Sequence, residues 1–379
     1  MKVDFYKHPL SLKNHLSFRK IIRGDIITSG PIGTLVEKKI CNFLNVKNTI
    51  LTSSWTTGAI ITLLSLNLKK NDEVILPSMT FAATANVVEL LGAKPIFVDT
   101  NKDTIITSYN EVIKKITKKT KVIFPVHLYG NMFDTKKLHK YIKKKKLKID
   151  IIEDSAHSFE STLKGDKSGK WSKAAIFSFY ATKNITCGEG GAIITNDIKF
   201  AKKIKELKNF GLNLTALERY KSKRHNDVDM KNLGIKAHLS DLLSFLLLPQ
   251  IKDIKKNLIL RKKIYKRYIN LLKDVKVKIP KIPSGCSSAF HIFVIGVEKR
   301  KRNKIIDYLK KKQIGCSLHY KPLHKMTYYK NKYNLIDKNF PNTTEWGDSC
   351  ITLPFHLKLT AKEQIYVVQT LKDAIRKIK

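Results

Sequence analysis

Short apolar runs alternate with amphipathic stretches along the first 200 residues. Residues 73–77, 121–126 and 174–179 are apolar and rich in β-branched or aromatic side chains, a pattern typical of strands buried in a sheet. Between them, segments such as 135–146 place apolar residues at helical spacing. Alternation of this kind predicts right-handed crossovers and a mostly parallel sheet with helices on both faces.

The same pattern extends to the other elements of the chain. We expect further helices over residues 33–44, 82–91 and 200–210, and further strands over 49–52, 95–99 and 192–197. A long helix over 240–272, punctuated by Pro249, should lead to a second domain. That domain has expected strands near 290–297 and expected helices near 302–313 and 361–378. We therefore predict an arm (1–27), a large domain (28–250) and a small C-terminal domain (251–379).

A single lysine follows the strand over 174–179. Residues 176–191 read IFSFYATKNITCGEGG, so that the strand breaks into a polar turn holding Lys183 and then reaches a cluster of glycines. A lysine just past a buried strand can lie in a low-dielectric cleft, where desolvation lowers its pKa and frees the amine as a nucleophile. A lysine in a surface loop is the alternative interpretation.

An acid follows the preceding strand. Residues 148–159 read KIDIIEDSAHSF, which places Asp154 at the end of an apolar run and His157 shortly after it. Parallel strands end at the same edge of a sheet, so Asp154 and the Lys183 turn should lie close together. The pair suits pyridoxal phosphate, which needs a lysine for a Schiff base and a carboxylate against its pyridine nitrogen. A buried structural histidine is the alternative role for His157.

At these residues the chain resembles the DegT/DnrJ/EryC1/StrS family of sugar aminotransferases, which have the aspartate aminotransferase fold type I. The matching pieces run in family order through nearly the whole chain: residues 71–100, 121–134, IIEDSAHSF, FSFYATKNITCGEGGAIITND and HYKPLH at 319–324. The resemblance implies an α/β fold, with a large domain built on a mostly parallel seven-stranded sheet and a small C-terminal α/β domain. It also implies pyridoxal 5′-phosphate as the cofactor and no metal.

The resemblance assigns roles to individual residues. Lys183 would carry the cofactor and then act as the general base and acid of the reaction, and Asp154 would hold the pyridine nitrogen. Phe81 would stack on the pyridine ring, and His157 would contact its ring hydroxyl. Further implied contacts are Ser178 with the cofactor phosphate and, on the substrate side, Ser29, Tyr180, Arg224, His319 and Tyr320.

The turn SSWTTG at 53–58 departs from the family pattern. A hydroxyl-rich turn at the start of a helix points backbone N–H groups and a positive dipole end at an anion, although an ordinary helix N-cap uses the same residues. The family places the cofactor phosphate here, usually with Ser-Gly-Thr, where this chain has Ser54, Trp55 and Thr56. We expect Thr56 and the Trp55 indole to contribute to the cofactor pocket and the departure to mark a subgroup with its own substrate.

A second departure lies at GIKAHLS, residues 234–240. The family usually reads Gly-x-Asn-Tyr-Arg-Met-Ser here, and its asparagine reaches the cofactor phosphate of the neighbouring subunit. Lys236 takes the place of that asparagine and can pair with a phosphate as a point charge. The resemblance therefore implies a homodimer with shared active sites.

The formal net charge of +42 would suit partners such as nucleic acid, anionic membranes or phosphorylated small molecules. The lysines are spread along the chain and are not interleaved with aromatic residues as on a base-stacking platform, so we expect mostly solvated surface and no nucleic-acid partner. The longest apolar run, near 242–248, is too short to span a bilayer, and the N-terminus has no apolar signal core.

Five scattered cysteines without a CxxC pair argue against a disulfide framework or a zinc site and favour the cytoplasm. Cys187, close to Lys183, is either a reactive thiol or a packing residue.

These observations predict a transaminase. The resemblance implies that it moves an amino group from L-glutamate to the ketone of a nucleotide-linked keto-sugar in surface polysaccharide or amino-sugar biosynthesis. A small phosphorylated ketone such as dihydroxyacetone phosphate is the alternative substrate. A sugar dehydratase is disfavoured, since such relatives carry histidine in place of Lys183. A nicotinamide enzyme is disfavoured by the lack of GxGxxG after the first strands. A basic nucleic-acid-binding protein on an inactive scaffold is the rival from another class.

Overall fold

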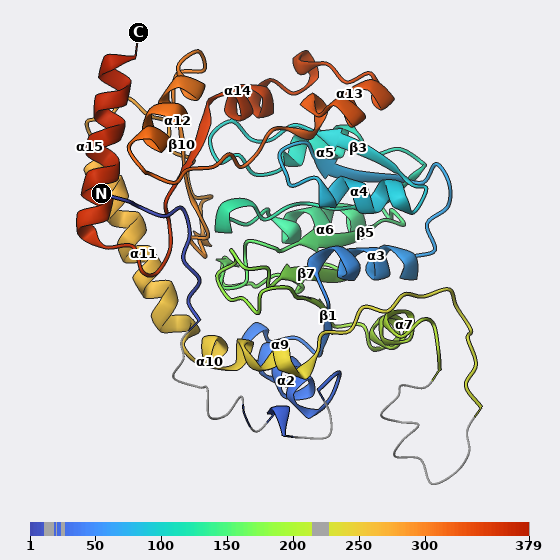
Figure 1. The fold of residues 1–379 in the computed structure, drawn as a ribbon. Coiled ribbons are helices and arrows are strands. Elements are labelled where there is room, and N and C mark those ends of the chain that lie inside the picture. The colour runs from blue at the N-terminus through green and yellow to red at the C-terminus, as the bar shows by residue number, and fades with distance from the viewer. Residues whose placement is uncertain (11–18, 20, 24–26, 214–226, 379) are drawn as a thin grey trace.

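A seven-stranded sheet lies at the centre of the molecule, which we describe from a computed structural model covering residues 1–10, 19, 21–23, 27–213 and 227–378 (Figure 1). The strand order is β1-β8-β7-β5-β4-β2-β3. The strands are β1 (Asn48–Thr52), β2 (Glu73–Pro77), β3 (Lys94–Val98), β4 (Thr120–Ile123), β5 (Asp150–Asp154), β7 (Ala174–Ser178) and β8 (Gly191–Thr195). Strand β8 is antiparallel to both neighbours, and the other adjacent pairs are parallel. The predicted mostly parallel seven-stranded sheet is confirmed.

Both faces of this sheet are buried, which explains why the strands read as continuous apolar runs. Neighbouring residues of one strand point to opposite faces: Val74 and Leu76 pack among residues of α3, α4 and α7, whereas Ile75 packs with residues of α5 and α6. Helix α2 covers the part of the second face nearest β1, β7 and β8. The helices are α2 (Pro31–Leu44), α3 (Trp55–Ser65), α4 (Ala83–Leu90), α5 (Tyr109–Lys114), α6 (Thr135–Lys144) and α7 (Ile198–Lys208).

A second hydrophobic core forms in the C-terminal part of the chain. Helices α11, α12 and α15 pack on the antiparallel pair of β10 and β11. Val3 belongs to the same core and bridges to Ile314, so the N-terminal segment lies on this part of the molecule (Figure 1). The elements are α11 (Ile254–Leu271), β10 (Phe293–Gly296), α12 (Arg302–Lys311), α13 (Thr327–Tyr333), α14 (Pro341–Ser349), β11 (Cys350–Leu353) and α15 (Ala361–Lys377), with a small pair of β6 (Thr162–Leu163) and β9 (Cys286–Ser287).

The long helix predicted over residues 240–272, with Pro249 as its one interruption, is in fact divided into three helices. The segment consists of α9 (Asp241–Phe245), α10 (Leu247–Lys252) and α11. Pro249 lies in the first turn of α10, where a missing N–H is tolerated, whereas in a continuous helix its ring would clash with the carbonyl of Phe245. The break before Leu247 therefore follows from the position of the proline.

Across the ranges that the structure describes, none of the helices is both long enough and apolar enough to cross a bilayer.

Candidate active site

A cavity of about 580 Å³ lies at the edge of the sheet where β1, β5 and β7 end. These three strands run in the same direction, so the residues that follow them converge. Of the residues singled out from the sequence, those that line this cavity are Trp55, Thr56, Phe81, Asp154, His157, Ser178, Tyr180, Lys183, His319 and Tyr320. The tertiary structure thus collects ten side chains from five separate segments around one space.

Two further predicted residues, Ser29 and Lys236, stand apart from this cavity. Ser29 and Lys236 are exposed and do not line it. Lys236 instead bridges to Asn209 through the backbone. The prediction for Lys236 concerns the cofactor of a neighbouring subunit and remains a prediction. Arg224 lies outside the described residues.

The carboxylate of Asp154 ends β5 and is buried. Its Oδ2 accepts a hydrogen bond from the Thr84 hydroxyl at 2.8 Å, and its Oδ1 accepts one from the Ala156 N–H at 3.1 Å. Burial raises the pKa of Asp154, and these two hydrogen bonds together with the charge of Lys183 oppose that rise. The bonds also fix the orientation of the carboxylate at the cavity wall.

Lys183 is half-buried in the turn after β7, where its backbone N–H donates to the Tyr180 carbonyl at 2.9 Å. Burial lowers the pKa of its ammonium group to about 8, and the charge of Asp154 partly opposes this shift. The charge of each group affects the pKa of the other, so Asp154 and Lys183 interact across the cavity. About a tenth of the amine is therefore free at pH 7.

The imidazole ring of His157 is neutral and can donate one hydrogen bond. Its Nδ1 accepts the backbone N–H of Tyr129 at 3.3 Å, which leaves the proton of the neutral ring on Nε2. That Nε2 lies 3.3 Å from the Tyr320 hydroxyl. Burial, together with the charge of Lys183, lowers the pKa of His157 well below its ordinary value. The imidazole therefore offers an N–H, not a positive charge, on this side of the cavity.

The N-terminus of α3 forms the remaining wall. Ser54 caps the helix by accepting the Thr57 N–H at 3.1 Å, and the preceding N–H groups of a helix have no partner inside it. The chain is packed closely here, because a Cβ at Gly191 would lie 2.6 Å from the Ser54 carbonyl carbon. The helix dipole and these N–H groups suit an anion such as a phosphate.

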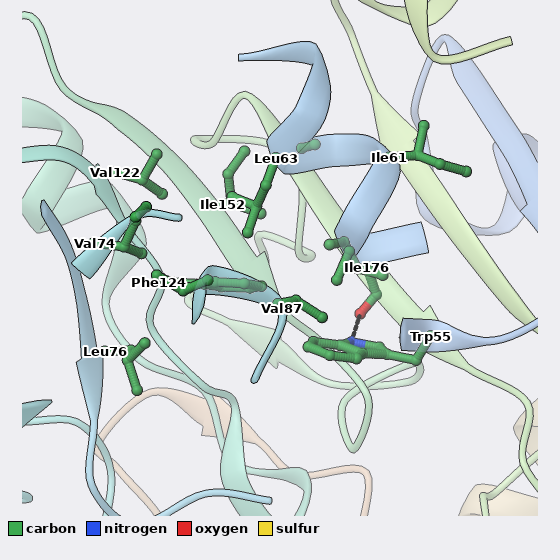
Figure 2. Close-up of a cluster of buried hydrophobic side chains, with 14 of the residues drawn as sticks. Trp55, Ile61, Leu63, Val74, Leu76, Val87, Val122, Phe124, Ile152 and Ile176 are labelled. Carbon is green, nitrogen blue, oxygen red and sulfur yellow. Dashed lines mark hydrogen bonds between the residues drawn. The ribbon is translucent and has the colours of Figure 1, made fainter. Parts of the chain in front are cut away.

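Trp55 has two roles in the structure. It lines the cavity, as the sequence predicted, but its indole also lies in the hydrophobic core and is only 7% exposed. The indole Nε1–H donates to the Ile176 carbonyl at 3.2 Å, and the ring stacks on Phe124 (Figure 2). A side chain that replaces the family glycine is thus an anchor between α3 and β7.

We expect Trp55→Ala to lower the free energy of unfolding by about 3–5 kcal/mol, the usual cost of truncating a buried aromatic residue. The measurement is chemical denaturation of the apoprotein followed by circular dichroism. Trp171→Ala is the matched control, since Trp171 is only partly buried. Equal losses in the two variants would contradict the anchoring role of Trp55.

Cys187 is buried, and burial raises the pKa of its thiol to about 12. The thiol also donates to the Glu189 carbonyl. A protonated, enclosed thiol is a poor nucleophile, so the structure supports the packing interpretation.

Other residues of the cavity have no counterpart among the sequence predictions. Phe5 lines it and stacks on His319, with ring centroids 6.0 Å apart. The neighbouring Tyr6 hydroxyl donates to the Ala181 carbonyl, beside the lysine turn. The Tyr6 contact joins residues 175 positions apart, and the Phe5 contact joins residues still farther apart in the sequence, so no local pattern reveals them. Thr84 lies one helical turn after Phe81, and this spacing is a signal that could have identified it.

The donor set fits pyridoxal phosphate. One cavity holds a buried carboxylate, an amine of lowered pKa and the N-terminus of a helix. These groups match the pyridine nitrogen, the aldehyde and the phosphate of that cofactor.

Comparison with known proteins gives the same class. Residues 12–372 match the DegT/DnrJ/EryC1/StrS aminotransferase family. The uncharacterised protein MJ1066 of Methanocaldococcus jannaschii is 34% identical over 359 residues, which cover 93% of this chain and 92% of that protein. The candidate sugar aminotransferase Spr1654 of Streptococcus pneumoniae, in its PMP form, is 29% identical with a TM-score of 0.93 and full coverage of both chains. PseC of Helicobacter pylori shares the fold, with 24% identity, a TM-score of 0.91 and full coverage of both chains.

The chain belongs to the DegT/DnrJ/EryC1/StrS aminotransferase family. It is a transaminase that depends on pyridoxal phosphate, as predicted from the sequence.

Proposed function

We propose that the chain transfers an amino group from L-glutamate to the ketone of a nucleotide-linked keto-sugar, in surface polysaccharide or amino-sugar biosynthesis. The observation that carries the reaction type is the placement of Lys183 and Asp154 on one cavity, each shifting the pKa of the other. The sugar substrate is supported by the likeness to Spr1654, which extends over the whole of both chains.

When bound, pyridoxal phosphate supplies a conjugated ring that accepts the electrons released as the Cα–H bond of the amino donor breaks. We propose that Lys183 Nζ takes up the Cα proton and later returns it to the product, which its pKa of about 8 permits near neutral pH. With the cofactor bound, the Asp154 carboxylate would hold a proton at the pyridine nitrogen. The His157 Nε2–H would donate to the ring oxygen.

The remaining residues of the cavity bind and orient. The first N–H groups of α3 would hold the cofactor phosphate, together with Thr56 and Ser178, which line the same cavity. Phe81, at the cavity wall and tilted against Tyr320 at 5.9 Å between ring centroids, offers a flat face to the pyridine ring. Tyr180, His319 and Tyr320 form the side that would face the keto substrate.

We also propose that the protein is a cytoplasmic homodimer of subunits with an arm (1–27), a large domain (28–250) and a small domain (251–379). Lys236, exposed on the surface, would meet the cofactor phosphate of the partner subunit, and Ser29 and Arg224 would meet the substrate.

The lowered pKa of Lys183 predicts how the apoprotein reacts with acetic anhydride. The ammonium form is lost as the pH rises through about 8, so labelling of Lys183 should follow that midpoint. At pH 7 its free amine is about 300 times more abundant than that of a lysine with a pKa near 10.5. Mass spectrometry of the digest gives the midpoint, with the exposed lysines as internal reference. A Lys183 midpoint near 10.5 would contradict the desolvated site.

The substrate is tested by a panel of keto-sugar nucleotides and small phosphorylated ketones, each incubated with L-glutamate while 2-oxoglutarate is followed. We expect turnover with at least one keto-sugar nucleotide. Turnover with dihydroxyacetone phosphate alone would favour the smaller substrate, an alternative that is consistent with the departure of Trp55 from the family motif. No 2-oxoglutarate with any ketone, from protein that binds the cofactor, would refute glutamate as the donor.

A further inference from the structure

Asn184 follows Lys183 directly, and its side-chain amide makes three polar contacts. The Asn184 Nδ2 donates to Glu160 Oε2 at 3.0 Å and to the Ala289 carbonyl at 2.9 Å. Its Oδ1 lies 3.0 Å from Nδ1 of His291. Since both amide hydrogens have acceptors, Oδ1 must be an acceptor, and His291 Nδ1 must carry a hydrogen. The orientation of this amide is therefore fully determined.

The acceptor Glu160 belongs to a buried ion pair. Its Oε1 accepts a hydrogen bond from Nη2 of Arg261, which lies on α11, and both residues are at most 4% exposed. Buried ion pairs recover little of their desolvation cost, and replacing one with apolar residues often leaves stability unchanged or increased. Stabilisation of the fold is therefore a weak explanation for the presence of this ion pair. The hydrogen bond from Asn184 to Glu160 provides a second explanation.

The same network reaches the cavity through His291. The ring of His291 packs against that of His157, with centroids 4.2 Å apart. Burial and the charge of Lys183 lower the pKa of His291 well below its ordinary value. A neutral His291 thus joins Asn184 to the wall of the cavity without adding a charge beside Lys183.

We propose that Asn184 is a positioning residue for Lys183, and that Glu160, itself fixed by Arg261, sets this position by accepting a hydrogen bond from the amide. The inference rests on the proposed role of Lys183. Contacts from the segment after β5 and from the segment before β10 converge on the residue next to the reactive amine, and α11 supports them through the bond from Arg261 to Glu160. An error of about 1 Å in placing such a group can reduce a rate about 100-fold, so the anchor matters for chemistry.

Two double variants separate positioning from stability. Glu160→Gln with Arg261→Met removes the ion pair but keeps an acceptor for Asn184. Glu160→Leu with Arg261→Met removes the same pair and the acceptor. Thermal unfolding of both apoproteins is measured first. Asn184→Ala, which leaves the ion pair in place, is a further variant for the case in which the leucine variant does not fold.

Two readouts are compared. The first is the pKa of Lys183 in the apoprotein by acetic anhydride labelling, and the second is the rate at which pyridoxal phosphate is fixed to Lys183 by borohydride. We expect the glutamine variant to keep a Lys183 pKa of about 8 and a trapping rate within about threefold of the wild-type rate. In the leucine variant and in Asn184→Ala, a loosened turn admits water, so the pKa rises towards that of an exposed lysine and trapping slows by about 10- to 100-fold.

Equal pKa values and trapping rates in the glutamine and leucine variants would overturn the proposal, as would rates that follow thermal stability alone. Wild-type protein that fails to form any adduct at Lys183 would refute the proposed function instead. The labelling measurement needs no cofactor and still decides whether Asn184 controls Lys183.

Discussion

Lys183→Ala is expected to abolish transamination, with the single-turnover rate constant falling by at least ~10⁴-fold. The substitution removes both the nucleophilic amine and the group that we propose moves the substrate proton, and a general acid or base alone contributes about 10²–10⁴-fold. The measurement is single-turnover conversion of L-glutamate to 2-oxoglutarate by protein loaded with pyridoxal phosphate. Borohydride treatment of the same variant should leave no cofactor attached to the chain.

Lys167→Met is the matched control for this variant. Burial also lowers the pKa of Lys167 to about 8, and its ammonium group lies 3.3 Å from the centroid of the Phe43 ring, but it does not line the cavity. We expect near wild-type turnover and normal trapping at Lys183. An inactive Lys167→Met variant together with an active Lys183→Ala variant would contradict the assignment of Lys183 as the reactive amine.

Asp154→Asn is expected to reduce the rate of the glutamate half-reaction by about 10²–10³-fold, the usual effect of removing one well-placed electrostatic contact from a reaction centre. The amide keeps the shape of the side chain, and the Thr84 hydroxyl can accept a hydrogen bond where it now donates one. The substitution therefore removes the charge opposite Lys183 and little of the packing. Stopped-flow measurement with saturating L-glutamate gives the rate.

The control for the charge is Asp99→Asn. Asp99 is also buried, and it accepts the backbone N–H groups of Asn342 and Thr343 at 3.1 and 2.8 Å, away from the cavity. This variant should lose stability but keep its half-reaction rate when assayed well below its unfolding temperature. A wild-type rate in Asp154→Asn would show that the negative charge of Asp154 is not required for the reaction.

The proximity of Asp154 and Lys183 could be predicted from the sequence, because parallel strands end at the same edge of a sheet. Asp154 and the Lys183 turn follow parallel strands, and both indeed line one cavity. The sequence places an interruption at Pro249, because proline is a local signal, but it does not show that the segment divides into the three separate helices α9, α10 and α11.

Local pattern and family motifs were thus sufficient for the sheet, the class of enzyme and most of the residues around the cavity. Three features required the folded chain: Phe5 against His319, the second role of Trp55 in the core, and the Asn184 amide between Glu160 and His291. Hydrophobic periodicity reports only which face of an element is buried. It contains no information about which distant polar side chain meets that element, and such contacts determine how Lys183 is held.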